Sequence, residues 1–230
     1  MTSAVPALQL KPLPTHCYRP EVQETSYERE PGYAERYRDR RFRTGSGSST
    51  DRRERAALRA LLAEKPTPPG LWLDAPSGAG RMTAELPGPA VQLDRSFDMV
   101  LACGEGRSRA CASVHHLPFA DDTFAGVLCF RLLQHIATPV ERIAILRELA
   151  RVTRGPIVVS FFDACSLQHL RRRLRRWLGG SRSGRTAVAR GVFLRELRAA
   201  GLVPLAVRAL RRFVAEQTLV LCERPRQPGP

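Results

Sequence analysis

The stretch "LWLDAPSGAGR" (residues 71–81) decides how this chain folds, because an apolar run leads directly into a glycine turn. "LWLDA" (71–75) is short, apolar and bounded by turn residues, which is typical of a buried strand. Gly78 and Gly80 allow the backbone to turn sharply and to approach a ligand closely. Taken alone, the stretch fits two structures equally well: a cofactor loop that enters a helix, and an ordinary turn.

Working outward, apolar runs predict further strands at "AVQLD" (90–94), at the start of "GVLCFRLLQHI" (126–136) and at "PIVVSFF" (156–162). The segments between them carry helical patterns, including a short helix over 99–104 and a helix over 193–202 that ends at Gly201. Two final runs, 203–213 and 217–224, follow one another without a helix, which favours an antiparallel hairpin. This alternation predicts an open α/β sheet covered by helices on both faces.

The clearest helix signals lie in "TPVERIAILRELARVTRG" (138–155). Thr138 is the expected cap, Pro139 suits the first helical position, and Glu141 completes a capping box. Gly155 is expected to end the helix in the left-handed conformation.

The chain divides into three parts by composition. Residues 1–30 are rich in proline and polar groups and are expected to be a disordered tail. Residues 31–66 are expected to form a helical lid or cap, in which "TGSGSST" (44–50) is a flexible break and Asp51 with Glu54 caps the next helix. Residues 67–226 are expected to form the main domain, with a basic insertion over 163–190.

Within the insertion, "SLQHLRRRLRRWLGG" (166–180) predicts a basic amphipathic helix. Four leucines and Trp177 share one face, and five arginines occupy the others. A cap over a substrate pocket is the favoured role for this helix. A packing helix with a solvated outer face and contact with a membrane or nucleic acid are the alternatives.

The formal net charge of +15 and the pI of about 10.9 suggest an anionic partner: nucleic acid, an acidic membrane face or an acidic substrate. Because 35 of the 37 basic residues are arginine, biased coding explains the charge equally well. The six cysteines form no C-x-x-C pair and no metal-ligand spacing, so no metal site is predicted. With no signal peptide and no apolar run of about 18 residues, a cytoplasmic location without a transmembrane segment is expected.

Asp94 directly follows the second predicted strand, twenty positions beyond Asp74. A carboxylate at this place can accept both ribose hydroxyls of an adenosine. The same residue also fits a simple acidic helix cap, because "DRSF" follows the strand.

Four segments in order, "LDAPSGAGR", "VQLDRSFDMV", "HHLPFADDTFAGVL" and "ERIAILRELARVTRG", resemble class I S-adenosylmethionine-dependent methyltransferases. The resemblance is to the type 11 group, related to quinone-biosynthesis enzymes, and it is close over residues 70–162 and looser over 193–222. It implies a Rossmann-like, doubly wound sheet of seven strands with an antiparallel terminal strand, to which this chain adds the basic helix. It also implies S-adenosylmethionine as the cofactor.

The resemblance further implies which residues contact the cofactor. The loop of Asp74, Ala75, Pro76, Ser77, Gly78 and Gly80 would hold the methionine end, Asp94 the ribose, and Arg95, Ser96, Ser113, His116 and Leu117 would surround the adenine. In this chain Ser113 stands where the family often has an aspartate, and Ala125 stands in place of the aspartate of F-D-x-V. Arg131 to His135 would line the pocket for methyl transfer.

Methyl transfer from a sulfonium is an in-line displacement with an activated leaving group, so alignment and water exclusion matter most. His135, beyond the fourth predicted strand, is the candidate general base, although a purely local hydrogen bond fits it equally well. The sequence therefore predicts methyl transfer to a small-molecule or lipid-like acceptor. An acidic acceptor suits the 15 arginines against 4 acidic residues from residue 156 onward.

Other functions remain open at this point. One is a basic RNA-binding or membrane-surface protein whose cofactor site is vestigial. Nucleic acid is not favoured, because "FRLLQHI" (130–136) lacks an aromatic motif for base stacking. A nicotinamide enzyme is disfavoured because the loop lacks the third glycine of G-x-G-x-x-G.

Overall fold

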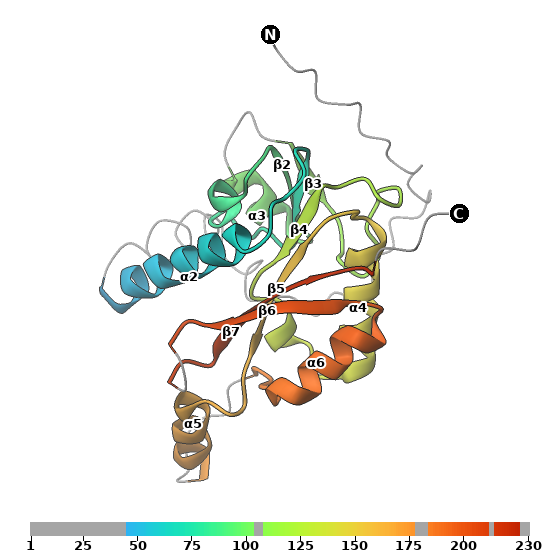
Figure 1. Ribbon diagram of the computed structural model, residues 1–230. Coiled ribbons are helices and arrows are strands. Elements are labelled where there is room, and N and C mark those ends of the chain that lie inside the picture. The colour runs from blue at the N-terminus through green and yellow to red at the C-terminus, as the bar shows by residue number, and fades with distance from the viewer. Residues whose placement is uncertain (1–44, 104–107, 178–183, 212–213, 226–230) are drawn as a thin grey trace.

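A computed structural model describes residues 45–103, 108–177, 184–211 and 214–225, which form a seven-stranded sheet with helices on both faces (Figure 1). The strand order is β3-β2-β1-β4-β5-β7-β6. The first five strands in this order are parallel, and β7 runs antiparallel to both β5 and β6. The strands are β1 (Trp72–Asp74), β2 (Ala90–Asp94), β3 (Arg109–Cys111), β4 (Gly126–Cys129), β5 (Ile157–Phe162), β6 (Val203–Ala209) and β7 (Gln217–Glu223). The predicted fold class and the terminal hairpin are confirmed.

Apolar residues cover both faces of the sheet because successive side chains of a strand point to opposite sides. On one face, Val127 and Val159 pack with α4 (Pro139–Arg151) and α6 (Arg190–Ala199). On the other face, Leu128 and Val158 pack with α2 (Gly45–Ala63). The continuous apolar runs seen in the sequence are therefore strands of the sheet centre, buried on both sides.

Helix α4 begins as predicted but ends for a different reason. The Thr138 hydroxyl accepts a hydrogen bond from the Glu141 amide at 3.2 Å, and Pro139 is the first helical residue. The prediction for Gly155 is wrong, because the helix ends at Arg151 and Gly155 is not among the glycines with positive φ. A Cβ there would lie 1.8 Å from the Ala125 carbonyl oxygen, so Gly155 is needed where two backbones meet closely. Gly201, by contrast, follows α6 with φ +80 as expected.

Helix α2 starts earlier than the sequence predicts. Residues 45–50 are helical and do not form a break, and Asp51 and Glu54 lie inside the helix, not at its cap. Glycine and serine are poor helix formers, so local propensity does not predict this extension. Residues 1–44, which include the predicted tail and the first part of the lid, lie outside the described residues.

The prediction of a helix directly after the glycine turn is also wrong. Only a single 3-10 turn, η1 (Thr83–Glu85), separates the loop from β2. Pro87 and Pro89 end this segment because each proline lacks a backbone donor. The loop therefore does not lead into an α-helix whose N-terminus could hold an anion.

Two further helices complete the described chain. The predicted short helix is α3 (Phe97–Ala102), and the basic amphipathic helix is α5 (Leu167–Trp177), which projects at the lower end of Figure 1. Among the described residues, no helix combines the length and apolar character needed to cross a bilayer.

Candidate functional site

The glycine loop lies at the carboxyl ends of β1 and β2, where parallel sheets of this kind bind ligands. The Ser77 amide donates to the Leu93 carbonyl at 2.8 Å, and the Gly80 amide donates to the Ser77 carbonyl at 3.0 Å. A Cβ on Gly80, which has φ +72, would lie 2.2 Å from the Gln92 side-chain nitrogen. Gly78 has φ +54, and a Cβ there would meet no atom within 4 Å. The loop is thus packed beneath Gly80 and open at Gly78.

Asp94, at the end of β2, is joined directly to this loop. Its Oδ2 accepts a hydrogen bond from the Gly78 amide at 2.9 Å, and its Oδ1 accepts one from the Ser96 amide at 3.0 Å. Burial raises the pKa of the Asp94 carboxyl, against the effect of these two amides. A carboxylate has about four acceptor positions, and two of them are used here. The other acceptor positions of the Asp94 carboxylate, beside the open side of Gly78, fit the ribose hydroxyls of a nucleoside.

Asp74 lies beneath the loop and not on its open side. Its carboxylate is 1% exposed and accepts a hydrogen bond from the Thr83 hydroxyl at 2.6 Å. That hydroxyl in turn accepts from the Gln92 side chain at 2.7 Å. Burial, together with the nearby charge of Asp94, raises the pKa of Asp74 to about 7, against the lowering effect of the Thr83 hydrogen bond. Asp74 is therefore positioned to hold the loop from below.

The remaining loop residues and Cys103 also hold the loop backbone in place. Ala75 is fully buried and donates its amide to the Leu128 carbonyl at 2.9 Å, while Pro76 is half-buried. Cys103, which the sequence did not single out, lies with its sulfur 3.3 Å from the Gly78 carbonyl oxygen. Burial raises the pKa of this thiol, so Cys103 packs against the loop as a neutral group.

The residues expected near an adenine divide into two groups. Ser96 is buried and its hydroxyl caps α3 by accepting from the Met99 amide, whereas Arg95 beside it is exposed. Ser113 and His116 are exposed in the segment after β3. Leu117 is buried in the core, and its amide donates to Glu148 on α4 at 2.8 Å. The exposed members remain predicted contacts, and Leu117 contributes packing to the sheet.

Arg131 and His135 follow β4 on the acceptor side of the expected site. Arg131 has φ 59, and its amide donates to the Ser160 hydroxyl at 2.7 Å. Its Nε donates to Glu54 Oε1 at 2.9 Å. His135 ends the 3-10 turn η2 (Leu133–His135) and is exposed. Arg131 is therefore anchored to α2, and His135 is accessible to a small molecule.

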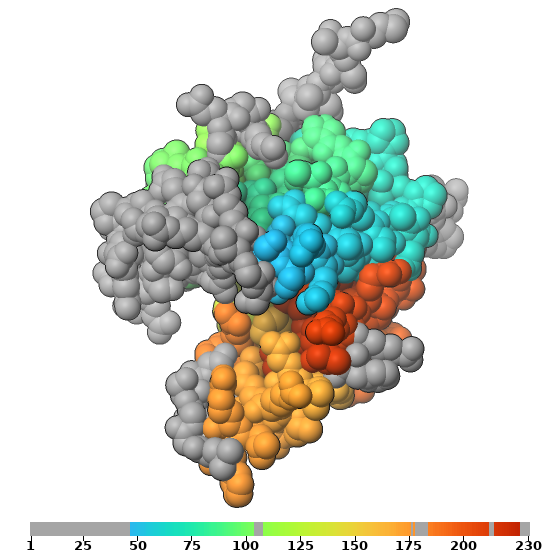
Figure 2. All heavy atoms as spheres, turned by 90° about the vertical axis from the view of Figure 1, so that its left-hand side faces the viewer, coloured from blue at the N-terminus to red at the C-terminus, as the bar shows by residue number. Residues whose placement is uncertain are grey.

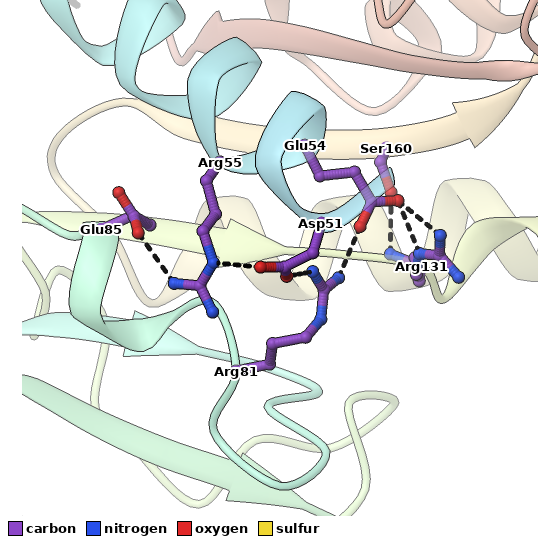
Figure 3. A network of polar contacts seen from close by, with 7 residues as sticks. All are labelled: Asp51, Glu54, Arg55, Arg81, Glu85, Arg131 and Ser160. Atoms are coloured by element: carbon purple, nitrogen blue, oxygen red, sulfur yellow. Dashed lines mark hydrogen bonds and ion pairs between the residues drawn. The ribbon is translucent and has the colours of Figure 1, made fainter. Parts of the chain in front are cut away.

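A network of charged residues joins α2 to the segments that follow β1 and β4 at the carboxyl edge of the sheet (Figure 3). Glu54, which is fully buried, accepts from Arg131 through Oε1 and from Arg81 Nη2 through Oε2 at 2.7 Å. Arg81 also pairs with Asp51, which accepts from Arg55 at 2.7 Å. Arg81 directly follows Gly80, so the network ties the loop of β1 and the segment after β4 to a single helix.

The sequence interpretation missed this network. Asp51 and Glu54 fit a capping pattern that depends only on neighbouring residues, whereas Arg81 and Arg131, which they also bind, lie 27 to 77 positions away. A usable signal did exist for Gln92, a polar residue within an otherwise apolar strand. Among the described residues, no three His, Cys, Asp or Glu side chains gather in a way that could hold a metal ion.

Comparison with known proteins gives one family match. Residues 73–156 match a family model described as a methyltransferase domain. The matched region runs from β1 to the residue before β5 and contains both the glycine loop and Asp94. No curated protein matches the chain.

Solved structures share the fold over most of the chain. A protein of Pyrococcus horikoshii is similar at 18% identity, with a TM-score of 0.63 over 83% of this chain and 99% of that one. A magnesium protoporphyrin IX methyltransferase of Synechocystis with bound SAH is similar at 18% identity, with a TM-score of 0.64 over 83% and 94%. A S-adenosylmethionine-dependent methyltransferase of Clostridium acetobutylicum is similar at 13% identity, with a TM-score of 0.60 over 75% and 91%.

Proposed function

We propose that this protein, a class I S-adenosylmethionine-dependent methyltransferase, transfers the methyl group to a small-molecule or lipid-like acceptor. The family resemblance, the enzyme class and the cofactor expected from the sequence are confirmed. The acceptor class and the roles of individual residues are the part that we propose.

The observation that carries the site assignment is the contact between Asp94 and Gly78. The carboxylate fixes the loop backbone through one oxygen and keeps unused acceptor positions beside the open face of Gly78. We therefore assign Asp94 to the ribose hydroxyls and the backbone at Ser77 to Gly80 to the methionine end of the cofactor. When bound, the sulfonium supplies an activated methyl group, and the protein orients the acceptor toward it.

Replacing Asp94 with asparagine is expected to weaken binding of S-adenosylhomocysteine by roughly ten- to a hundredfold, because charge-assisted hydrogen bonds to the hydroxyls are lost. Isothermal titration calorimetry measures this directly. Asp98→Asn, on the exposed first turn of α3, is the matched control and should bind like the unchanged protein. Equal affinities for the two variants would show that Asp94 only shapes the loop.

On the acceptor side, we propose that His135 is the general base. It is exposed beyond β4, so an acceptor hydroxyl or amine can approach it without rearrangement of the core. The arginine-rich segment after β5 supports an acceptor that carries negative charge, because a positively charged surface attracts anionic molecules.

His135→Gln is expected to slow methyl transfer about 100-fold while leaving the affinity for S-adenosylhomocysteine unchanged. The rate is measured as transfer of labelled methyl groups into the small-molecule and lipid fractions of a cell extract. His115→Gln is the control, since His115 lies 3.4 Å from Glu141 on α4. A His135 variant as fast as the control would remove His135 from the chemistry.

A further inference from the structure

Helix α5 presents its apolar side to solvent. Trp177 is 83% exposed, Leu170 60%, Leu174 57% and Leu167 41%. At about 100° per residue, these four side chains fall within a sector of about 80°. We define this sector as the outer face of α5. In Figure 2 the helix lies at the lower end of the molecule, in orange, away from α2.

The polar side of the same helix is the one that contacts the rest of the protein. Arg172 pairs with Glu216 at 3.0 Å, and His169 lies 3.7 Å from the same carboxylate. Arg172 also lies over the Phe162 ring, 5.8 Å from its centroid. The Gln168 amide donates to the Val214 carbonyl at 3.0 Å. The helix is thus attached through polar groups, which is the reverse of the usual arrangement for a surface helix.

Arginines border the outer face on both sides. Arg171 and Arg175 lie on one flank and Arg173 on the other by helical geometry, and all three are exposed. An apolar stripe with tryptophan and leucine, flanked by arginines, is the pattern of a helix that lies in the interface of an anionic bilayer. A second copy of the chain fits poorly, because it would bring the same arginines together. Nucleic acid fits poorly as well, since the centre of the surface is aliphatic.

We propose that the outer face of α5 docks the protein on an anionic lipid surface, with the leucines and Trp177 in the headgroup region and the flanking arginines on lipid phosphates. This inference goes beyond methyl transfer, because docking needs neither cofactor nor acceptor. It places the segment after β5 next to the bilayer, where a lipid-like molecule would enter.

The full chain is tested by co-sedimentation with vesicles of phosphatidylcholine alone and of phosphatidylcholine with phosphatidylglycerol. Binding to the anionic vesicles and weaker binding to the neutral ones is the expected result. Leu170→Ser with Leu174→Ser should lower the partition coefficient about 100-fold. Val140→Ser with Val203→Ser, at two other exposed sites, is the matched control and should bind normally.

The contribution of the arginines that flank the outer face is tested separately. Arg171→Gln with Arg175→Gln should lower binding to anionic vesicles about 30-fold, at about 1 kcal/mol for each arginine near the surface. Arg52→Gln with Arg53→Gln, on the exposed side of α2, removes the same net charge elsewhere and should have little effect. Equal losses in both pairs would show attraction by net charge alone and would overturn the assignment to α5.

Trp177 also reports its own environment. The chain has two tryptophans, and Trp72 is 1% exposed, so solvent-dependent changes in fluorescence come from Trp177. Vesicles should shift its emission to shorter wavelength and protect it from acrylamide. Protection already present in the free protein would mean that another segment or a second copy covers the outer face, and it would refute membrane docking. Binding of tRNA with no binding of vesicles would refute it too.

Discussion

Replacing Glu54 with glutamine is expected to lower the free energy of unfolding by about 3–5 kcal/mol. Glu54 is fully buried and accepts from two guanidinium groups, of Arg81 and Arg131. A glutamine keeps the shape but offers one acceptor oxygen, so its NH2 group must face one of the two arginines. The loss therefore combines an unpaired donor with two positive charges that have lost their shared counter-charge.

Urea denaturation measures the effect, with Glu64→Gln as the matched control. Glu64 pairs with Arg208 at 2.9 Å, but both side chains are more than 40% exposed, and such pairs contribute about 0–1 kcal/mol. The Glu54 variant should also bind S-adenosylhomocysteine more weakly, because Arg81 directly follows the loop. If the two variants lose the same stability, Glu54 does not hold α2 to the edge of the sheet.

Replacing Asp74 with asparagine is expected to stabilise the protein at pH 8 by about 4 kcal/mol and to change little at pH 4. Burial raises the pKa of Asp74 from 3.8 to about 7, so the folded protein holds a proton that the unfolded chain has released between these values. The stability from this group is complete below pH 3.8 and is lost as the pH rises through about 7. A shift of about 3 units corresponds to about 4 kcal/mol.

The asparagine carries no charge at any pH, and its carbonyl oxygen can still accept the hydrogen bond from Thr83. The difference in stability between the variant and the unchanged protein should therefore grow from pH 4 to about pH 7 and then level off. Asp98→Asn, at an exposed position, is the control and should follow the unchanged protein throughout. A difference that is constant with pH would show that Asp74 is ionised in the folded state at all of these values.

The sequence predicted those features that depend on neighbouring residues. The strand at 90–94 has the predicted bounds, and α4 begins at the predicted cap, because periodicity and capping act over a few positions. Asp94 was found in the same way, since it is the last residue of a predicted strand. The helix after the glycine turn was predicted from the same kind of pattern and is absent, because the prolines nearby left room for one 3-10 turn only.

The sequence by itself thus determined where these strands lie along the chain, the position of the glycine turn and the acid at the end of β2. Tertiary structure alone decided that Asp51 and Glu54 are helix-interior anchors, because Arg81 and Arg131 come from the segments that follow β1 and β4, far along the chain. It also decided which side of α5 faces solvent. Amphipathic periodicity defines two faces of a helix, but the contacts of the polar face with Glu216 and Phe162 turn it inward and leave Trp177 outside.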